Sequence, residues 1–204
     1  MSLKVSRAGG ASMEPVPEGS YIAICVGVYD IGVQKTEYKG EVKESPKLAV
    51  TWELPEEVIQ GGSYEGEPRL ISKMYTASLA DRSTLKADLE SWRGRAFTDE
   101  EMEGFDLVNI LGKACMLQVI HSQNNGRTYA NIKAVTPVYK GVAVPQPANE
   151  LKAFDLDADS WLWELDHGGL PEWIVKKVKE SETYKARMAQ EEMPEPLTAG
   201  AEAF

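Results

Sequence analysis

The sequence predicts a mainly β protein of the α+β class, a five-stranded barrel with a helical insertion between its third and fourth strands. Three observations predict it. Several short segments alternate apolar and polar side chains, the apolar period becomes helical between residues 81 and 104, and an Asn125-Gly126 pair separates the last two strand-like segments. A C-terminal helix and an acidic tail are expected after the barrel.

The length of 204 residues suits one core of about 120 residues with appendages. Residues 1–18 mix Gly, Ser, Ala and Pro without a period, so we expect a flexible N-terminal arm. The barrel domain is expected over residues 19–140. A linker, a short helix and an acidic tail are expected over residues 141–204.

The first two strands are predicted at residues 21–29, where Ile and Val alternate with small or aromatic side chains, and at residues 48–54, where every second side chain is large and apolar. Residues 32–47 between them are polar and contain Gly40 and Pro46, which predicts a long loop or the tip of a hairpin. A third strand is expected at residues 69–76.

The insertion is predicted as two helices. Asp81 is suited to cap the first, whose apolar face consists of Leu85, Leu89 and Trp92. Thr98 and Glu101 form a capping box that starts a second helix near Asp99, and Gly104 ends it.

Two final strands are predicted at residues 113–121 and 127–135, because Asn-Gly readily supplies the two positive φ angles of a tight hairpin turn. Three strands, a helical insertion and a hairpin follow one another as in an OB-fold barrel. An open β-sheet or a two-sheet sandwich with a helical insertion fits the same order. One more helix is expected over residues 171–187.

Catalytic and metal-binding motifs are missing, so we expect a protein that is not an enzyme and needs no cofactor. His121 and His167 stand outside any zinc-ligand spacing, and the sequence has neither a phosphate-binding Gly-Lys-Ser/Thr loop nor a Gly-x-Ser-x-Gly elbow. The alternating acids from Asp155 to Asp159 lack the Gly and final Glu of a calcium loop. The sequence therefore predicts no metal-binding residues and no catalytic residues.

No apolar run approaches the roughly 20 residues that cross a bilayer, and the first 18 residues lack a secretory signal, so we expect no membrane partner. Cys25 and Cys115 lie in apolar strand-like runs, where a thiol acts as a small hydrophobe. A cytoplasmic location without disulfides follows.

The net charge of −10 is unevenly distributed. Residues up to Lys140 hold 16 Lys and Arg against 19 Asp and Glu, whereas later residues hold 6 against 13. A nearly neutral body is compatible with a local basic groove, and local positive potential is what attracts a polyanion.

Cations and aromatic rings of the predicted strands and loops are typical of single-stranded nucleic-acid binding. The predicted binding residues are Lys35, Tyr38, Lys39, Lys43, Arg69, Lys73, Tyr75, Arg127 and Tyr129.

Several short motifs resemble a group of small bacteriophage proteins from replication and recombination gene clusters. The resemblance covers about residues 20–185 and is carried by Trp92-Arg93-Gly94-Arg95, Phe97-Thr98, Gly104-Phe105-Asp106-Leu107, Leu111-Gly112-Lys113, Gly126 to Ile132, Leu170 to Ile174 and Glu180 to Tyr184. Such proteins are regarded as OB-fold and similar to single-stranded-DNA-binding proteins. The resemblance implies single-stranded DNA binding in phage replication or recombination, in the cytoplasm of a bacterial host cell.

The end of the chain is similar to bacterial single-stranded-DNA-binding proteins, whose acidic tails end in Phe and recruit replication and repair enzymes. Glu202 and Phe204 are the partner-binding residues that this similarity implies, although the Asp run and the Pro of that pattern are missing. The tail is expected to recruit such enzymes or to inhibit DNA binding. The sequence leaves open whether the chain forms a homo-oligomer.

Two further functions fit the sequence. One is a non-catalytic adaptor that binds a replication or recombination enzyme through the β domain. The other is a DNA mimic that uses the acidic tail against a nucleic-acid enzyme. Salt-dependent binding of an oligonucleotide separates the hypothesis of single-stranded DNA binding from the adaptor and the DNA mimic.

Overall fold

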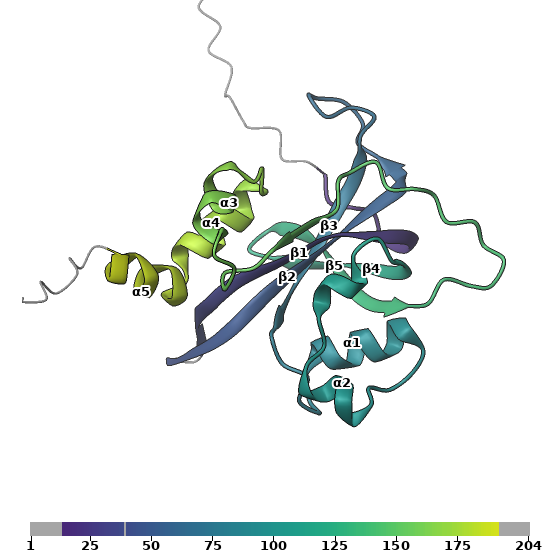
Figure 1. Cartoon of the computed structure of the whole chain (residues 1–204). Coiled ribbons are helices and arrows are strands. Elements are labelled where there is room, and N and C mark those ends of the chain that lie inside the picture. The colour runs from purple at the N-terminus through teal and green to yellow at the C-terminus, as the bar shows by residue number, and fades with distance from the viewer. Residues whose placement is uncertain (1–13, 39, 192–204) are drawn as a thin grey trace, which may run out of the picture. The chain divides into compact units, whose positions relative to one another are not determined.

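The computed structural model describes residues 14–38 and 40–191 (Figure 1). Its described residues divide into two compact units. The first unit contains residues 14–28 and 49–153, and the second contains residues 29–48 and 154–191. Strands β1 (Gly19–Tyr38) and β2 (Glu41–Val58) each contribute to both units.

The remaining strands are β3 (Pro68–Thr76), β4 (Ala114–Asn124), β5 (Arg127–Thr136) and β6 (Lys152–Phe154). An antiparallel sheet in the order β3-β2-β1-β4-β5 forms the centre of the first unit, and the short β6 pairs with β1. The prediction of a mainly β, α+β protein is confirmed. Among the described residues β3 and β5, the two ends of this path, contact each other without pairing, so the sheet is not closed.

Helix α1 (Thr84–Arg93) lies against β3 and β5, and its buried side chains are the predicted Leu85, Leu89 and Trp92. The predicted cap is wrong by two residues: the N-cap is Ser83, whose hydroxyl accepts a hydrogen bond from the Lys86 amide. The Asp81 carboxylate lies 2.8 Å from Lys86 Nζ instead, so it pairs with a side chain rather than with the free helix amides.

The second helix of the insertion, α2 (Asp99–Glu103), has the predicted capping box. Its Thr98 hydroxyl accepts from the Glu101 amide at 3.3 Å, and the Glu101 carboxylate accepts from the Thr98 amide at 3.0 Å. Gly104 follows the helix as predicted, and a 3₁₀ turn, η1 (Leu107–Ile110), leads to β4.

Strand β2 is buried on both of its faces between Leu48 and Leu54. Trp52 packs near Trp92 of α1, with ring centroids 6.1 Å apart. Glu53 is the next residue, so its side chain points to the opposite face, where it is fully buried. Its carboxylate accepts hydrogen bonds from the Ala148 and Asn149 amides. The predicted linker therefore lacks regular structure but is tied to the sheet of the first unit.

Both predicted turns are hairpins. Asn125 and Gly126 have φ angles of 50° and 72°, which confirms the tight turn between β4 and β5. Of the two alternatives for residues 32–47, the hairpin is the observed one: β1 continues to Tyr38 and β2 starts at Glu41, so most of this polar segment is strand.

The second unit contains the ends of β1 and β2 and three helices, α3 (Trp161–His167), α4 (Glu172–Glu180) and α5 (Glu182–Glu191). The single helix predicted over residues 171–187 is wrong, because the chain is extended at Ser181, with φ −70° and ψ 151°. The buried Ser181 hydroxyl donates to the Val178 carbonyl and accepts from the Tyr184 amide, so it ends α4 and starts α5. The short helix α3 was not predicted separately.

Candidate nucleic-acid interface

A surface groove of about 310 Å³ lies in the first unit between β3, β5 and residues 14–16. We call it the β3–β5 groove. Two of the predicted binding residues line it. Arg69 comes from the start of β3, and Tyr129, which is 46% exposed, comes from the start of β5. The groove also includes the exposed Leu70.

Hydrogen bonds of residues 14–18 hold this segment beside the groove. Arg69 Nη1 donates to the Glu14 carbonyl at 2.6 Å, and the His121 ring lies 2.8 Å from the Val16 carbonyl. The Glu18 carboxylate accepts from the His121 amide at 2.7 Å, and Val16 is buried. His121, which we did not expect to bind a metal, therefore fixes residues 16–18 beside β4.

The Arg69 guanidinium retains hydrogen-bonding capacity. Its Nε is buried and has no hydrogen-bond partner among the described residues, and the nearest carboxylate, that of Glu57, is 4.0 Å away. No described carboxylate lies closer to the guanidinium than Glu57, so Arg69 keeps most of its positive charge for the groove.

Lys73 and Tyr75 lie on β3 but are used inside the protein. Both donate to the Asp88 carboxylate of α1, at 2.6 Å and 2.8 Å, and Lys73 Nζ lies 5.1 Å from the centre of the Tyr75 ring. The Tyr75 side chain is buried, and burial raises the pKa of its hydroxyl well above the ordinary range. This ring therefore packs in the core.

The predicted loop cations belong to the second unit. Lys35 bridges Glu44 at 3.2 Å and Glu182 at 3.0 Å, and hydrogen bonds to both carboxylates, chiefly to Glu182, raise its pKa. Lys43 is exposed and makes no ion pair with a described residue. Lys39 lies outside the described residues, and for Tyr38 only the backbone, in β1, is described.

Arg127 starts β5 beside the hairpin turn, where it is exposed and has no ion-pair partner in the described part of the chain. The tail residues Glu202 and Phe204 lie outside the described residues. The structure thus brings Arg69 and Tyr129 together in one groove and places the other described binding residues elsewhere.

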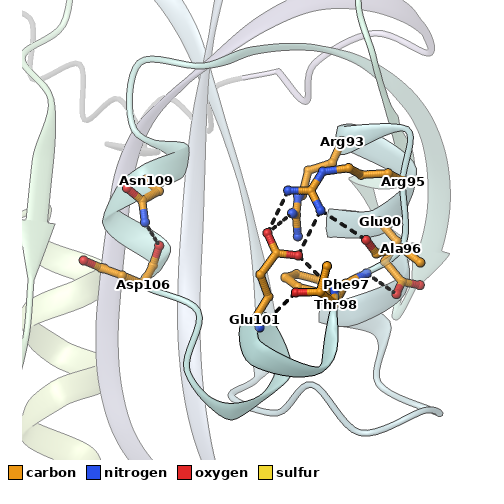
Figure 2. A network of polar contacts seen from close by, with 9 residues as sticks. All are labelled: Glu90, Arg93, Arg95, Ala96, Phe97, Thr98, Glu101, Asp106 and Asn109. Carbon is orange, nitrogen blue, oxygen red and sulfur yellow. Dashed lines mark hydrogen bonds and ion pairs between the residues drawn. The ribbon is translucent and has the colours of Figure 1, made fainter.

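A cluster that the sequence did not single out as a site connects the end of α1 to α2 (Figure 2). Both Arg93 and Arg95 donate to the Glu101 carboxylate, Arg95 through two bonds of 2.7 Å and 2.9 Å. The Arg93 guanidinium also lies over two rings, 4.3 Å from the centre of Phe97 and 5.2 Å from that of Phe105. Two arginines on either side of Gly94, near a capping-box Glu, were the available signal in the sequence.

The same cluster lines a second cavity of about 370 Å³, which we call the α1–α2 pocket. Its wall contains the cations of Arg93, Arg95 and Lys113, and its single carboxylate is Glu101. The hydrogen bond from Arg95, then those from the Thr98 amide and Arg93, lower the pKa of Glu101 to about 2. Glu101 is therefore an anion at neutral pH.

Within the described residues, no three or more His, Cys, Asp or Glu side chains are grouped so as to hold a metal ion. Asp157 of the alternating acids instead pairs with Arg187 at 2.5 Å. The thiols of Cys25 and Cys115 are free and buried, and burial raises the pKa of Cys25 to about 12 and that of Cys115 well above its ordinary value, so neither is a thiolate at neutral pH.

None of the described helices has the length and apolar character needed to cross a membrane. No model of a known protein family matches the sequence, and no significant match is found among curated proteins.

Proposed function

We propose that this protein binds single-stranded DNA through the β3–β5 groove. One observation carries the proposal: the cation of Arg69 and the exposed ring of Tyr129 line the same groove. A single nucleic-acid strand needs this combination, a cation for a phosphate and an aromatic face for an unpaired base. Stacking of one base on such a ring contributes roughly 1 to 3 kcal/mol.

The surroundings of the groove suit an extended nucleic-acid strand better than a small compact ligand. Leu70 and Met74 are exposed on β3, and Arg127 continues the cationic side beyond Tyr129 along β5. An extended ligand following β5 would meet Arg127 and Tyr129 in succession, because consecutive strand residues rise by about 3.3 Å.

The strand order also supports the proposal. In an OB-fold barrel the third and fifth strands are the neighbours that complete the closure, and here they are the two ends of the sheet path. We therefore propose an OB-like domain, and with it a role in phage-type DNA replication or recombination, as the sequence resemblance implies. The proposed role is non-catalytic.

The variant Tyr129→Leu tests the groove. It keeps an apolar side chain but removes the aromatic face, and the fluorescence anisotropy of a labelled oligo-dT should report about tenfold weaker binding, since one lost base stack is worth roughly 1 to 3 kcal/mol. Tyr139→Leu is the matched control, because Tyr139 is 75% exposed and lies outside the groove. Equal affinities of both variants and the unchanged protein would contradict the proposal.

A second candidate, the non-catalytic adaptor, is favoured by the surface of the second unit. Trp163 of α3 is 64% exposed and stacks on His167, with ring centroids 5.5 Å apart, and Trp173 of α4 is 37% exposed. Exposed tryptophans are enriched at protein-protein contacts. If Trp163→Ala abolishes binding of a replication or recombination enzyme and leaves oligo-dT binding unchanged, this second unit is an adaptor.

A further inference from the structure

The α1–α2 pocket has an excess of positive charge over a partly apolar wall. Three cationic side chains, those of Arg93, Arg95 and Lys113, face the single carboxylate of Glu101. The Asn109 side chain, whose amide nitrogen donates to the Asp106 carbonyl at 3.0 Å, also lines the pocket, and the apolar part consists of Trp92, Phe105 and Ile110. A ligand that suits this wall carries negative charge at one end and an apolar, planar body at the other.

Two cations of the pocket are not fully used by the protein. Lys113 is exposed and forms no ion pair with any described residue, and only its backbone is engaged, with the Ile110 carbonyl and the Cys25 amide. Arg93 Nη1 is buried and lacks a hydrogen-bond partner in the described part of the chain, although Glu101 accepts from Nη2. The rings of Phe97 and Phe105 contact the Arg93 guanidinium, so Arg93 keeps its positive charge in the pocket wall with a single carboxylate partner.

Glu101 organises the cations without neutralising them. Its carboxylate accepts from both arginines, so it fixes Arg95 beside Arg93 while one negative charge faces three positive ones. The fork of Arg95 is occupied by the Glu101 carboxylate, so Arg95 offers a phosphate its positive charge and its remaining N–H donors, and Lys113 adds a point charge. Arg95, which is 56% exposed in its side chain, and Lys113 can both reach a phosphate at the mouth of the pocket.

We propose that the α1–α2 pocket binds a nucleotide unit, with the phosphate at Arg95 and Lys113 and the base against the apolar wall that includes Phe105. The volume of about 370 Å³ falls within the range of about 300 to 1,000 Å³ usual for small-ligand pockets. The nucleotide is either free or part of a strand. The pocket shares no lining residue with the β3–β5 groove, so this site does not depend on the proposed function.

Calorimetric titration of the full chain with dTMP, thymidine and inorganic phosphate tests the site. The nucleotide should bind at least tenfold more tightly than either part, because only it engages both the cations and the apolar wall. Lys113→Glu should weaken dTMP binding at least tenfold. Lys133→Glu is the control: Lys133 is also an exposed lysine of the first unit without an ion-pair partner among the described residues, and it does not line the pocket.

Three results would overturn the proposal: no heat of binding with dTMP at millimolar concentration, the same loss of affinity in Lys113→Glu and Lys133→Glu, or tighter binding of an acidic peptide than of dTMP. Unchanged melting temperatures of both variants ensure that a loss of binding is not a loss of folding.

Oligo-dT distinguishes the two sources of the nucleotide. If Lys113→Glu weakens both dTMP and oligo-dT, the pocket takes a nucleotide of a strand, and if it weakens dTMP alone, the pocket takes a free nucleotide. Tyr129→Leu separates this site from the groove, since it should leave dTMP binding unchanged even where it weakens oligo-dT. Failure of oligo-dT binding with intact dTMP binding would thus reject the groove and retain the pocket.

Discussion

The fully buried carboxylate of Glu53 holds Asn149, a residue 96 positions later in the chain, through two hydrogen bonds of 2.8 Å. One comes from the Asn149 backbone amide and the other from its side chain, and the Ala148 amide adds a third at 2.9 Å. A buried carboxyl group is costly unless it is hydrogen-bonded, and here three N–H donors satisfy its oxygens. The pairing fixes residues 148 and 149 to the sheet.

Replacing Glu53 with Gln should therefore lower the free energy of unfolding by about 1 to 3 kcal/mol, because an amide NH₂ then faces donors. Denaturant unfolding measures this loss, and hydrogen exchange at Ala148 and Asn149 should accelerate. Glu56→Gln is the control, since Glu56 is exposed on the same strand. A loss of equal size in both variants would show that Glu53 has no special role.

Gly32 in the second unit has a φ of 69°, and a Cβ there would lie 2.8 Å from Ser181 Oγ and 3.1 Å from a methyl group of Leu156. Gly32→Ala combines a left-handed backbone, which costs roughly 1 to 2 kcal/mol, with this steric overlap. Gly40→Ala is matched to it, because Gly40 has a φ of 82° but open space around it. Thermal unfolding should show a clearly larger loss for Gly32→Ala, and equal losses would mean that the contact with Ser181 is not tight.

Glu101 should make stability depend on pH in the acidic range. Its pKa is about 2 in the folded protein against an ordinary 4.5, so the stabilisation that its charge provides is complete above about 4.5 and disappears as the pH falls through about 2. Melting temperatures of the unchanged protein and of Glu101→Gln should differ at pH 6 and converge near pH 2.5. A difference that is independent of pH would exclude the ion pairs with Arg93 and Arg95 as its cause.

The acidic end of the chain should weaken DNA binding. Residues 192–204 hold Glu192, Glu195 and Glu202 and no Lys or Arg, so under the proposed function we expect them to act as a tethered anion that competes with DNA. Truncation after Glu191 should strengthen oligo-dT binding about threefold at low salt and less at high salt, where charges are screened. Replacing the three Glu by Gln keeps the length and should have the same effect. Unchanged affinity in both would exclude autoinhibition.

Local sequence signals predicted local structure well. The Asn125-Gly126 turn and the Thr98/Glu101 capping box depend on neighbouring residues, and both are confirmed. The cap at Asp81 and the helix through Ser181 were wrong because two competing polar residues, Ser83 and Ser181, formed the hydrogen bonds with the backbone instead.

Hydrogen bonds and ion pairs between residues far apart in the sequence were not predicted. Nothing near Glu53 indicates that its partner is Asn149, and nothing near Lys73 indicates Asp88 of a later helix. Among the predicted binding residues, periodicity correctly assigned Arg69 and Tyr75 to one strand, but only the packing of α1 determines that Tyr75 is buried while Arg69 reaches a groove. The α1–α2 pocket likewise depends on η1, which places Asn109 and Ile110 in the wall of the same cavity as Arg93 and Arg95.

The most direct test of single-stranded DNA binding is a titration of labelled oligo-dT with the full chain, followed by anisotropy between about 50 and 200 mM salt, with duplex DNA of the same length as the comparison. If the β3–β5 groove binds single-stranded DNA, binding of the single strand is saturable and weakens as salt rises, with a log-log slope of about −0.7 for each phosphate contacted. The duplex binds more weakly, because its bases cannot stack on Tyr129. No binding of oligo-dT at the lowest salt, or equal affinity for the duplex, would contradict the proposed function.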